Sequence, residues 1–304
     1  MLQLRKDHIM ANQAAKYLVT GASGQLGGHA VDALLGKVPA ENVVALVRRP
    51  EAAAALEAKG VEVRLGDYTD RASLEKAFAG IDRLLLISSS ELGQRAPQHI
   101  NAIEAATAAG VGFVAYTSIL RADTSPLQLA GEHRVTEQAI RASGILHALL
   151  RNGWYTENKT GTIAQAIAHG AFIGAAGEGR FSSAARRDYA EAAVAVLTAD
   201  APQSGAVHEL AGDESYSMAE FAAETARAAG TPVAYRDMSE AEYAAALEAA
   251  GLPGPFAAIL ADSDAGAAKG ALEDHGRALS GLIGRPTTPW RESVAEAVRA
   301  RKAA

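Results

Sequence analysis

Residues 17–35 read YLVTGASGQLGGHAVDALL: a short apolar run, a glycine-rich turn and an amphipathic stretch of helical length. The turn contains the pattern GxxGxxG. Such a turn needs glycine so that it can be tight, so that backbone can approach a pyrophosphate, and so that the helix can pack closely on the strand. The following helix presents free amides and the positive end of its dipole to the phosphates. Because the required strand–turn–helix context is present, we predict a dinucleotide site, with a turn that binds no ligand as the alternative. The predicted pyrophosphate loop comprises Gly21, Ala22, Ser23, Gly24, Gln25, Leu26 and Gly27.

The same alternation of short apolar runs and longer alanine-rich stretches continues to about residue 150. The patterns predict strands at 17–20, 43–47, 61–65, 84–87, 113–117, 146–150 and 207–210, and helices at 25–35, 51–60, 71–80, 97–109, 127–143 and 189–197. Continuous apolar strands separated by helices are typical of a parallel sheet that is covered on both faces. We therefore predict an α/β fold with a doubly wound, Rossmann-type sheet.

The regular alternation ends near residue 155. Residues 156–185 are glycine-rich and predicted to be irregular, and Asp188 is predicted to cap the helix that follows. Beyond residue 212 the chain is acidic and mostly helical. We expect three parts: a flexible tail at 1–15, a dinucleotide-binding domain at 16–155 and 186–212, and a smaller, mostly helical substrate-binding domain at 156–185 and 213–304.

Composition excludes several classes of protein. The 304 residues are 49% hydrophobic and 21% charged, as expected for a globular chain, and the formal net charge of −6 argues against a nucleic-acid partner. The absence of cysteine excludes disulfides, thiol catalysis and Cys-based metal sites, and the histidines show no metal-ligand spacing, so we predict no metal. No apolar run reaches the roughly 18 residues of a membrane span, and we predict a cytoplasmic protein.

The end of the second predicted strand indicates which nucleotide is bound. NAD enzymes usually place Asp or Glu there, to accept from the ribose hydroxyls, whereas this chain has Arg48 and Arg49. A guanidinium can bind a 2′-phosphate with two hydrogen bonds. The pair predicts NADPH as the cofactor, with weaker binding of NADH. Arg48 is the better candidate because it follows the strand directly; a merely solvated basic edge is the alternative.

Polar residues follow the next strands at the same edge of the sheet. Asp67, with Tyr68 beside it, is placed to accept from the adenine amino group, or belongs to a turn in which Asp70 caps the next helix. After the fourth strand, small hydroxyl side chains would let the cofactor ribose approach, although a simple polar loop is the alternative. These candidates are Ser88, Ser89, Ser90 and Glu91, and Thr117 at the end of the fifth strand joins the predicted cofactor residues.

Several longer runs resemble one family. They are LLLISSSELGQRAPQH (84–99), AYTSILRADTSPL (115–127), LLRNGWYTEN (149–158), FIGAAGEG (172–179) and LIGRPTT (282–288). Together they resemble the bacterial NADPH-dependent quinone oxidoreductases of the atypical, NmrA-like class of short-chain dehydrogenases, with triphenylmethane dye reductases as close relatives. The resemblance implies a nucleotide domain and a small C-terminal domain with the active cleft between them. It places the 2′-phosphate on Arg48 and the nicotinamide beside residues 88–91 and beside Asn152, Gly153, Trp154 and Tyr155.

Most short-chain dehydrogenases exchange a proton through a Tyr-x-x-x-Lys pair on the helix after the fifth strand. Tyr155 and Lys159 have that spacing, but they follow the sixth strand, so we interpret the spacing as a coincidence. His133 and Glu137 occupy the corresponding helix one turn apart. We interpret them as a structural pair rather than as proton donors.

The missing Tyr–Lys pair favours an electron-poor acceptor, because a hydroquinone anion needs no strong acid to complete its reduction. We predict direct hydride transfer from NADPH to a quinone without a flavin, by a monomer or homodimer, and assign no catalytic residue. Trp154, Tyr155 and Phe172 could stack on the acceptor ring or could pack in the core. A non-catalytic redox sensor and a dye reductase remain alternatives. A sugar-nucleotide epimerase would need the tyrosine base.

Overall fold

The computed structural model describes residues 15–201 and 204–303, so the predicted tail, apart from its last residue, lies outside the described residues. The chain forms two compact units. The N-terminal unit comprises the described residues up to Ile119, together with Glu132–Arg151 and Tyr189–His208. The C-terminal unit comprises Leu120–Gly131, Asn152–Asp188 and the residues from Glu209 onward. The segment Leu120–Gly131, which we predicted to belong with the nucleotide-binding part, clusters with the C-terminal unit.

A seven-stranded sheet has the strand order β3-β2-β1-β4-β5-β6-β9. Its strands are β1 (Tyr17–Val19), β2 (Val43–Val47), β3 (Glu62–Leu65), β4 (Arg83–Leu86), β5 (Phe113–Ile119), β6 (Leu146–Asn152) and β9 (Ala206–Leu210). The pairings of β3 with β2, β2 with β1, β1 with β4 and β4 with β5 are all parallel. The order reverses at β1, whose neighbours are β2 and β4, and open α/β sheets bind ligands at such a reversal. The predicted doubly wound sheet is confirmed.

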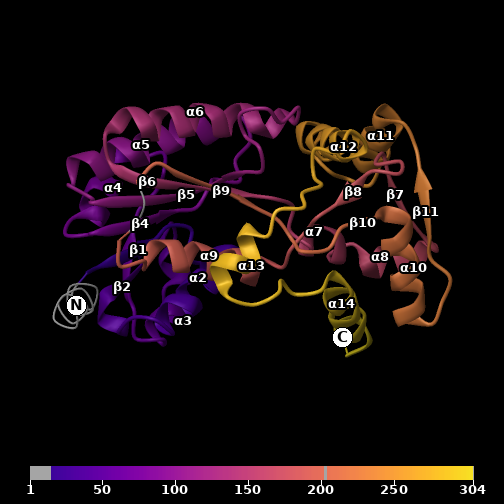
Figure 1. Ribbon diagram of the computed structural model, residues 1–304, viewed down its shortest axis with the longest axis horizontal. Coiled ribbons are helices and arrows are strands. Elements are labelled where there is room, and N and C mark those ends of the chain that lie inside the picture. The colour runs from indigo at the N-terminus through magenta and orange to yellow at the C-terminus, as the bar shows by residue number, and fades with distance from the viewer. Residues whose placement is uncertain (1–14, 202–203, 304) are drawn as a thin grey trace. The chain divides into compact units, whose positions relative to one another are not determined.

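Helices cover both faces of this sheet (Figure 1). On one face lie α4 (Arg71–Phe78), α5 (Arg95–Ala108) and α6 (Gln128–Ser143), and on the other α2 (Gln25–Leu35), α3 (Ala54–Glu57) and α9 (Arg186–Leu197). The helix predicted at 51–60 is shorter in the structure. Its first residues form a 3₁₀ turn at Pro50–Ala52 before α3 begins.

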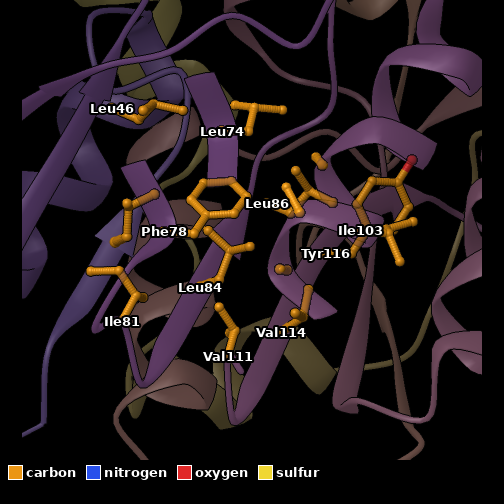
Figure 2. Packing of buried hydrophobic residues seen from close by; sticks show 14 of the residues in the cluster. Leu46, Leu74, Phe78, Ile81, Leu84, Leu86, Ile103, Val111, Val114 and Tyr116 are labelled. Carbon is orange, nitrogen blue, oxygen red and sulfur yellow. The ribbon is translucent and has the colours of Figure 1, made fainter. Parts of the chain in front are cut away.

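The core between the sheet and α4 and α5 follows the two-residue period of the strands. Leu84 and Leu86 of β4 point to the same face as Val114 and Tyr116 of β5, and all four belong with Phe78 of α4 to one buried cluster (Figure 2). Burying each large apolar side chain contributes about 1.5–3 kcal/mol. The carboxyl ends of the strands are therefore held on a rigid support.

The C-terminal unit contains short elements that pair over long sequence distances. β7 (Ala171–Gly174) runs parallel to β11 (Ala234–Asp237), and β8 (Arg180–Phe181) runs antiparallel to β10 (Tyr216–Ser217). Its helices are α7 (Glu157–Thr160), α8 (Ile163–His169), α10 (Met218–Ala229), α11 (Glu240–Ala249), α12 (Gly254–Ala268), α13 (Ala278–Ile283) and α14 (Trp290–Ala303). The prediction that residues 156–185 are irregular was wrong, because partners distant in the sequence stabilise these short strands.

Asp188 does not cap a helix as predicted. α9 begins two residues earlier, and the fully buried Asp188 carboxylate faces the C-terminal run LIGRPTT instead. It accepts hydrogen bonds from the Thr288 amide at 2.7 Å, from the Thr288 hydroxyl at 3.0 Å and from Nη2 of Arg285 at 2.8 Å. A buried carboxylate needs such compensation, and the C-terminal run supplies it.

Candidate functional site: a dinucleotide cradle at the carboxyl edge of the sheet

The glycine-rich loop requires glycine at two positions. Gly21 has φ +58°, and its carbonyl accepts the Gly24 amide at 2.9 Å to close the turn. A Cβ atom on Gly27 would stand 2.2 Å from the Gly21 carbonyl oxygen and 2.8 Å from Cα of Ala22. The first turn of α2 therefore lies directly against the loop, as the motif predicts.

The N-terminus of α2 is open to a ligand. No side chain caps it at Gly24, and its first turn contains no acidic residue. Ser23, Gly24 and Gln25 are exposed, whereas the side chains of Ala22 and Leu26 are buried. The first amides of a helix have no acceptor within the helix and attract anions. The cradle thus fits the pyrophosphate of a dinucleotide, which backbone groups rather than side chains would hold.

The hydroxyl of Thr20 holds together the ends of β1 and β4. It donates to the Leu85 carbonyl at 3.2 Å and accepts from the Ile87 amide at 2.8 Å. The Tyr68 hydroxyl lies 2.6 Å from Thr20 Oγ1 and 2.7 Å from the Ile87 carbonyl oxygen, to either of which it can donate. Burial raises the pKa of Tyr68 well above its usual value. This hydroxyl faces the support of the loop, so a cofactor contact through it is not supported.

The turn after β3 contains the two aspartates that the sequence left ambiguous. Asp70 caps α4 by accepting from the Ser73 amide at 3.2 Å, which confirms the capping alternative. Oδ1 of Asp67 accepts from the amide and the hydroxyl of Thr69, each at 2.8 Å. Partial burial would raise the pKa of Asp67, but these hydrogen bonds and the charge of Arg48 outweigh it and lower that pKa. Contact between Asp67 and adenine stays a prediction.

Arg48 and Glu91, both predicted cofactor residues, contact each other. Nη1 of Arg48 donates to Oε1 of Glu91 at 2.7 Å, although both side chains remain substantially exposed. The second carboxylate oxygen of Glu91 accepts from Nε2 of the buried Gln98 at 2.6 Å. The neighbouring Arg49 is also exposed, at the start of the 3₁₀ turn.

The loop after β4 is fixed by side chains behind it. The Ser88 amide donates to Oγ1 of Thr117 at 2.9 Å, and the Ser89 amide donates to Nε2 of His99 at the same distance. Nε of Arg95 donates to the Ser89 carbonyl at 2.7 Å. Thr117 is buried and supports the loop from behind, and its contact with the cofactor stays a prediction. Sequence reasoning missed His99 and Arg95, although both lie in the quoted run 84–99.

His99 belongs to a buried polar network. Because Nε2 accepts from Ser89, Nδ1 carries the proton and donates to Oγ1 of Thr136 at 2.9 Å. The neighbouring Tyr116 hydroxyl lies 2.7 Å from Nδ1 of His133. Burial, aided by the charge of Arg95, lowers the pKa of His99 to about 3 and also lowers that of His133. Both imidazoles are neutral at pH 7.

Glu137 has its own buried partners. It accepts two hydrogen bonds from the Arg151 guanidinium, at 2.9 and 2.8 Å, and one from the Ser118 hydroxyl at 2.7 Å. This pair ties α6 to β5 and β6. His133 and Glu137 are therefore each held by a buried partner of their own, and their interpretation as structural residues stays a prediction.

The predicted residues at the end of β6 and directly after it lie in the C-terminal unit. Asn152 is buried, its Nδ2 donates to the Tyr155 hydroxyl at 3.4 Å, and its Oδ1 has no hydrogen-bond partner among the described residues. The Gly153 amide donates to the Leu210 carbonyl, and the Trp154 carbonyl accepts from the Ala184 amide. The Tyr155 ring lies 4.8 Å from the guanidinium carbon of Arg186. A role of residues 152–155 beside the nicotinamide stays a prediction.

Contacts within the C-terminal unit bear on two further predictions. Nζ of Lys159 donates to Oδ1 of the buried Asp264 at 2.7 Å and lies over the Phe181 ring, which agrees with a coincidental Tyr155–Lys159 spacing. Phe172 is buried and packs edge-to-face on Phe221, with ring centroids 5.5 Å apart. The structure places Phe172 in the core rather than on a substrate surface.

Within residues 15–201 and 204–303, no three His, Asp or Glu side chains are grouped so that they could hold a metal ion. None of the helices in this same part of the chain is both long and apolar enough to cross a membrane.

Comparison with known proteins agrees with this geometry. Residues 21–200 match the model of a family described as NAD(P)H-binding. The chain is 54% identical to quinone oxidoreductase 2 of Escherichia coli (strain K12) over 276 residues, which cover 91% of this chain and 96% of that protein. The crystal structure of the E. coli NADPH-dependent quinone oxidoreductase with NADPH has 53% identity and a TM-score of 0.89, covering 92% and 99% of the two chains. The structure of Citrobacter sp. triphenylmethane reductase with NADP(H) has 38% identity and a TM-score of 0.88, covering 93% and 100%. The chain belongs to the NmrA-like, NAD(P)H-binding family that contains these reductases.

Proposed function

We propose that this protein is an NADPH-dependent quinone oxidoreductase that transfers hydride directly from the nicotinamide to a small quinone, without a flavin or a metal. The observation that carries the proposal is the 54% identity to a quinone oxidoreductase over nearly the whole of both chains. The open N-terminus of α2 and the arginine at the end of β2 support NADPH as the cofactor.

The loop and Arg48 account for binding. Amides at the start of α2 hold the pyrophosphate, and the guanidinium of Arg48 binds the 2′-phosphate, so NADH should bind more weakly. Nε and Nη2 of Arg48 have no partner among the described residues, which leaves these donors available to a phosphate. The protein contributes chiefly by positioning, which can lower a barrier by several kcal/mol.

The residues of α6 do not supply an acid. The positions that correspond to the Tyr–Lys pair hold His133 and Glu137, and both are buried and hydrogen-bonded within the fold. When bound, the reduced nicotinamide supplies a hydride. The hydride brings both electrons and one hydrogen, so its transfer converts a quinone into the hydroquinone monoanion, and a single proton completes the reduction. A phenolic oxygen has a pKa near 10, so water can deliver that last proton at neutral pH.

Turnover of NADPH with several acceptors tests the proposal. Protein shown to be free of flavin by its absorbance spectrum is mixed with NADPH or NADH and with 1,4-benzoquinone, menadione or malachite green, and loss of nicotinamide absorbance is followed. We expect quinone-dependent oxidation that prefers NADPH. Turnover confined to the dye would identify a dye reductase. Tight NADPH binding without turnover on any acceptor would identify a redox sensor, and turnover that requires added flavin would overturn direct transfer.

A further inference from the structure

The ion pair between Arg48 and Glu91 connects two strand ends that are not neighbours. Arg48 follows β2 and Glu91 follows β4, and β1 lies between these strands in the sheet. The contact between Nη1 and Oε1, at 2.7 Å, therefore joins the two flanks of β1, which leads directly into the glycine-rich loop. The Glu91 carboxylate therefore already accepts from one nitrogen, Nη1, of the guanidinium that we assign to the 2′-phosphate.

Glu91 is held in this position from behind. Oε2 accepts from Nε2 of Gln98 at 2.6 Å, and Gln98 projects from α5 with only 4% of its surface exposed. The amide of Glu91 also donates to the Ser89 hydroxyl at 3.2 Å. Most exposed ion pairs are loose because two long side chains must be ordered together. Here a buried amide fixes one partner, so the carboxylate stays beside Arg48.

A 2′-phosphate brings about 1.5–2 negative charges at pH 7, as other phosphate monoesters do. The phosphate must either share the Arg48 guanidinium with Glu91 or displace the Glu91 carboxylate from it. A second carboxylate, that of Asp67, is also near enough for the charge of Arg48 to affect its pKa. Ligands that lack the 2′-phosphate do not meet this competition. The effect of Glu91 should therefore fall on NADPH and spare NADH.

We propose that Glu91 is a specificity-determining residue, an internal competitor for the Arg48 guanidinium that weakens binding of the 2′-phosphate and so limits the preference for NADPH over NADH. This inference rests on the proposed use of NADPH. It assigns Glu91 to the adenosine end of the cofactor, whereas the family resemblance placed residues 88–91 beside the nicotinamide. Faster release of the oxidised cofactor is the functional consequence.

Calorimetric titration of the whole protein tests the inference without relying on turnover. The probes are NADPH and NADH, and the fragments 2′,5′-ADP and AMP, which differ only in the 2′-phosphate. We expect Glu91→Gln to lower the Kd of NADPH and of 2′,5′-ADP by about three- to tenfold, the range set by a surface charge pair of about 1 kcal/mol. The Kd values of NADH and AMP should change by less than about twofold. Added salt should reduce the difference in NADPH affinity between Glu91→Gln and the unaltered protein.

The matched control is Glu75→Gln, which removes another exposed carboxylate paired with an arginine, Arg71, at 2.8 Å on α4. It should leave all four Kd values unchanged. If Glu91→Gln leaves the affinity for 2′,5′-ADP unchanged or weakens it, the competitor role is wrong. Failure of the unaltered protein to bind NADPH would instead overturn the proposed function, so the two failures are distinguishable.

Discussion

The amide of Ser89 donates a hydrogen bond to Nε2 of His99 over 2.9 Å, so a buried imidazole that must stay neutral fixes the loop after β4. The pKa of His99 lies at about 3 in the folded protein, against an ordinary value of 6.5. Between these two values the unfolded chain binds a proton that the folded chain does not. The contribution of His99 to stability is therefore complete above pH 6.5 and is lost as the pH falls toward 3.

Equilibrium urea unfolding at several pH values between 7 and 4 checks this linkage. We expect the free energy of unfolding to fall with decreasing pH, with His99 accounting for up to about 1.4 kcal/mol per pH unit. His99→Gln keeps an acceptor for the Ser89 amide but cannot be protonated. The free energy of unfolding of this variant should therefore depend less steeply on pH, because up to one proton fewer is taken up on unfolding. Identical pH dependence of the two proteins would show that His99 is not the titrating group.

Replacing Gly27 by alanine should damage the cradle. The added methyl would lie 2.2 Å from the Gly21 carbonyl oxygen, and only a shift of backbone can relieve that contact. Overpacking of this kind costs about 1–3 kcal/mol, and we expect NADPH affinity to fall at least about tenfold, as measured by calorimetry. Gly28→Ala is the matched control, because its Cβ would meet only the Ala22 carbonyl at 3.9 Å. If both variants lost NADPH affinity equally, the close approach at Gly27 could not be the cause of the loss.

Arg48→Ala should separate the two nicotinamide cofactors. A hydrogen bond to a charged group contributes about 1.5–3 kcal/mol, so the KM for NADPH should rise about tenfold to a hundredfold while that for NADH changes little. Steady-state kinetics with both cofactors measure this. Arg49→Ala, which alters the adjacent exposed arginine, should have a much smaller effect. Similar losses with NADPH and NADH would contradict the assignment of Arg48 to the 2′-phosphate.

Tyr155 and Lys159 should respond differently to substitution. Tyr155→Phe should keep most of kcat, because its ring contacts Arg186 and its hydroxyl is not activated by Lys159. Lys159→Met should instead destabilise the fold by about 3–5 kcal/mol, since it leaves Asp264 buried without its cation. Thermal unfolding and kcat, measured on both variants, distinguish the two effects. A thousandfold loss of kcat in both, with stability intact, would restore the Tyr–Lys pair as catalytic.

The sequence alone predicted those parts of the molecule whose structure is determined by residues close together in the chain. The glycine spacing of residues 21–27 and the apolar runs of β1, β2, β4 and β5 each carry their signal within a few neighbouring residues. Asp188 was misassigned because its partner Thr288 lies 100 residues away. β7 and β8 were missed because their pairing partners also come from distant sequence. His99 gave no signal, since nothing in the helical pattern of α5 indicates that an imidazole meets the Ser89 amide.

Asp188 also bears on how the chain is completed during synthesis. Its carboxylate is fully buried, and it accepts hydrogen bonds from Arg285 and Thr288, which lie about 100 residues further along the chain. Until residues 285–288 have left the ribosome, this carboxylate lacks these donors. The C-terminal unit should therefore reach its final packing only after that segment has emerged, and a shortened chain that ends before Arg285 should be a substrate for proteolysis rather than a smaller enzyme.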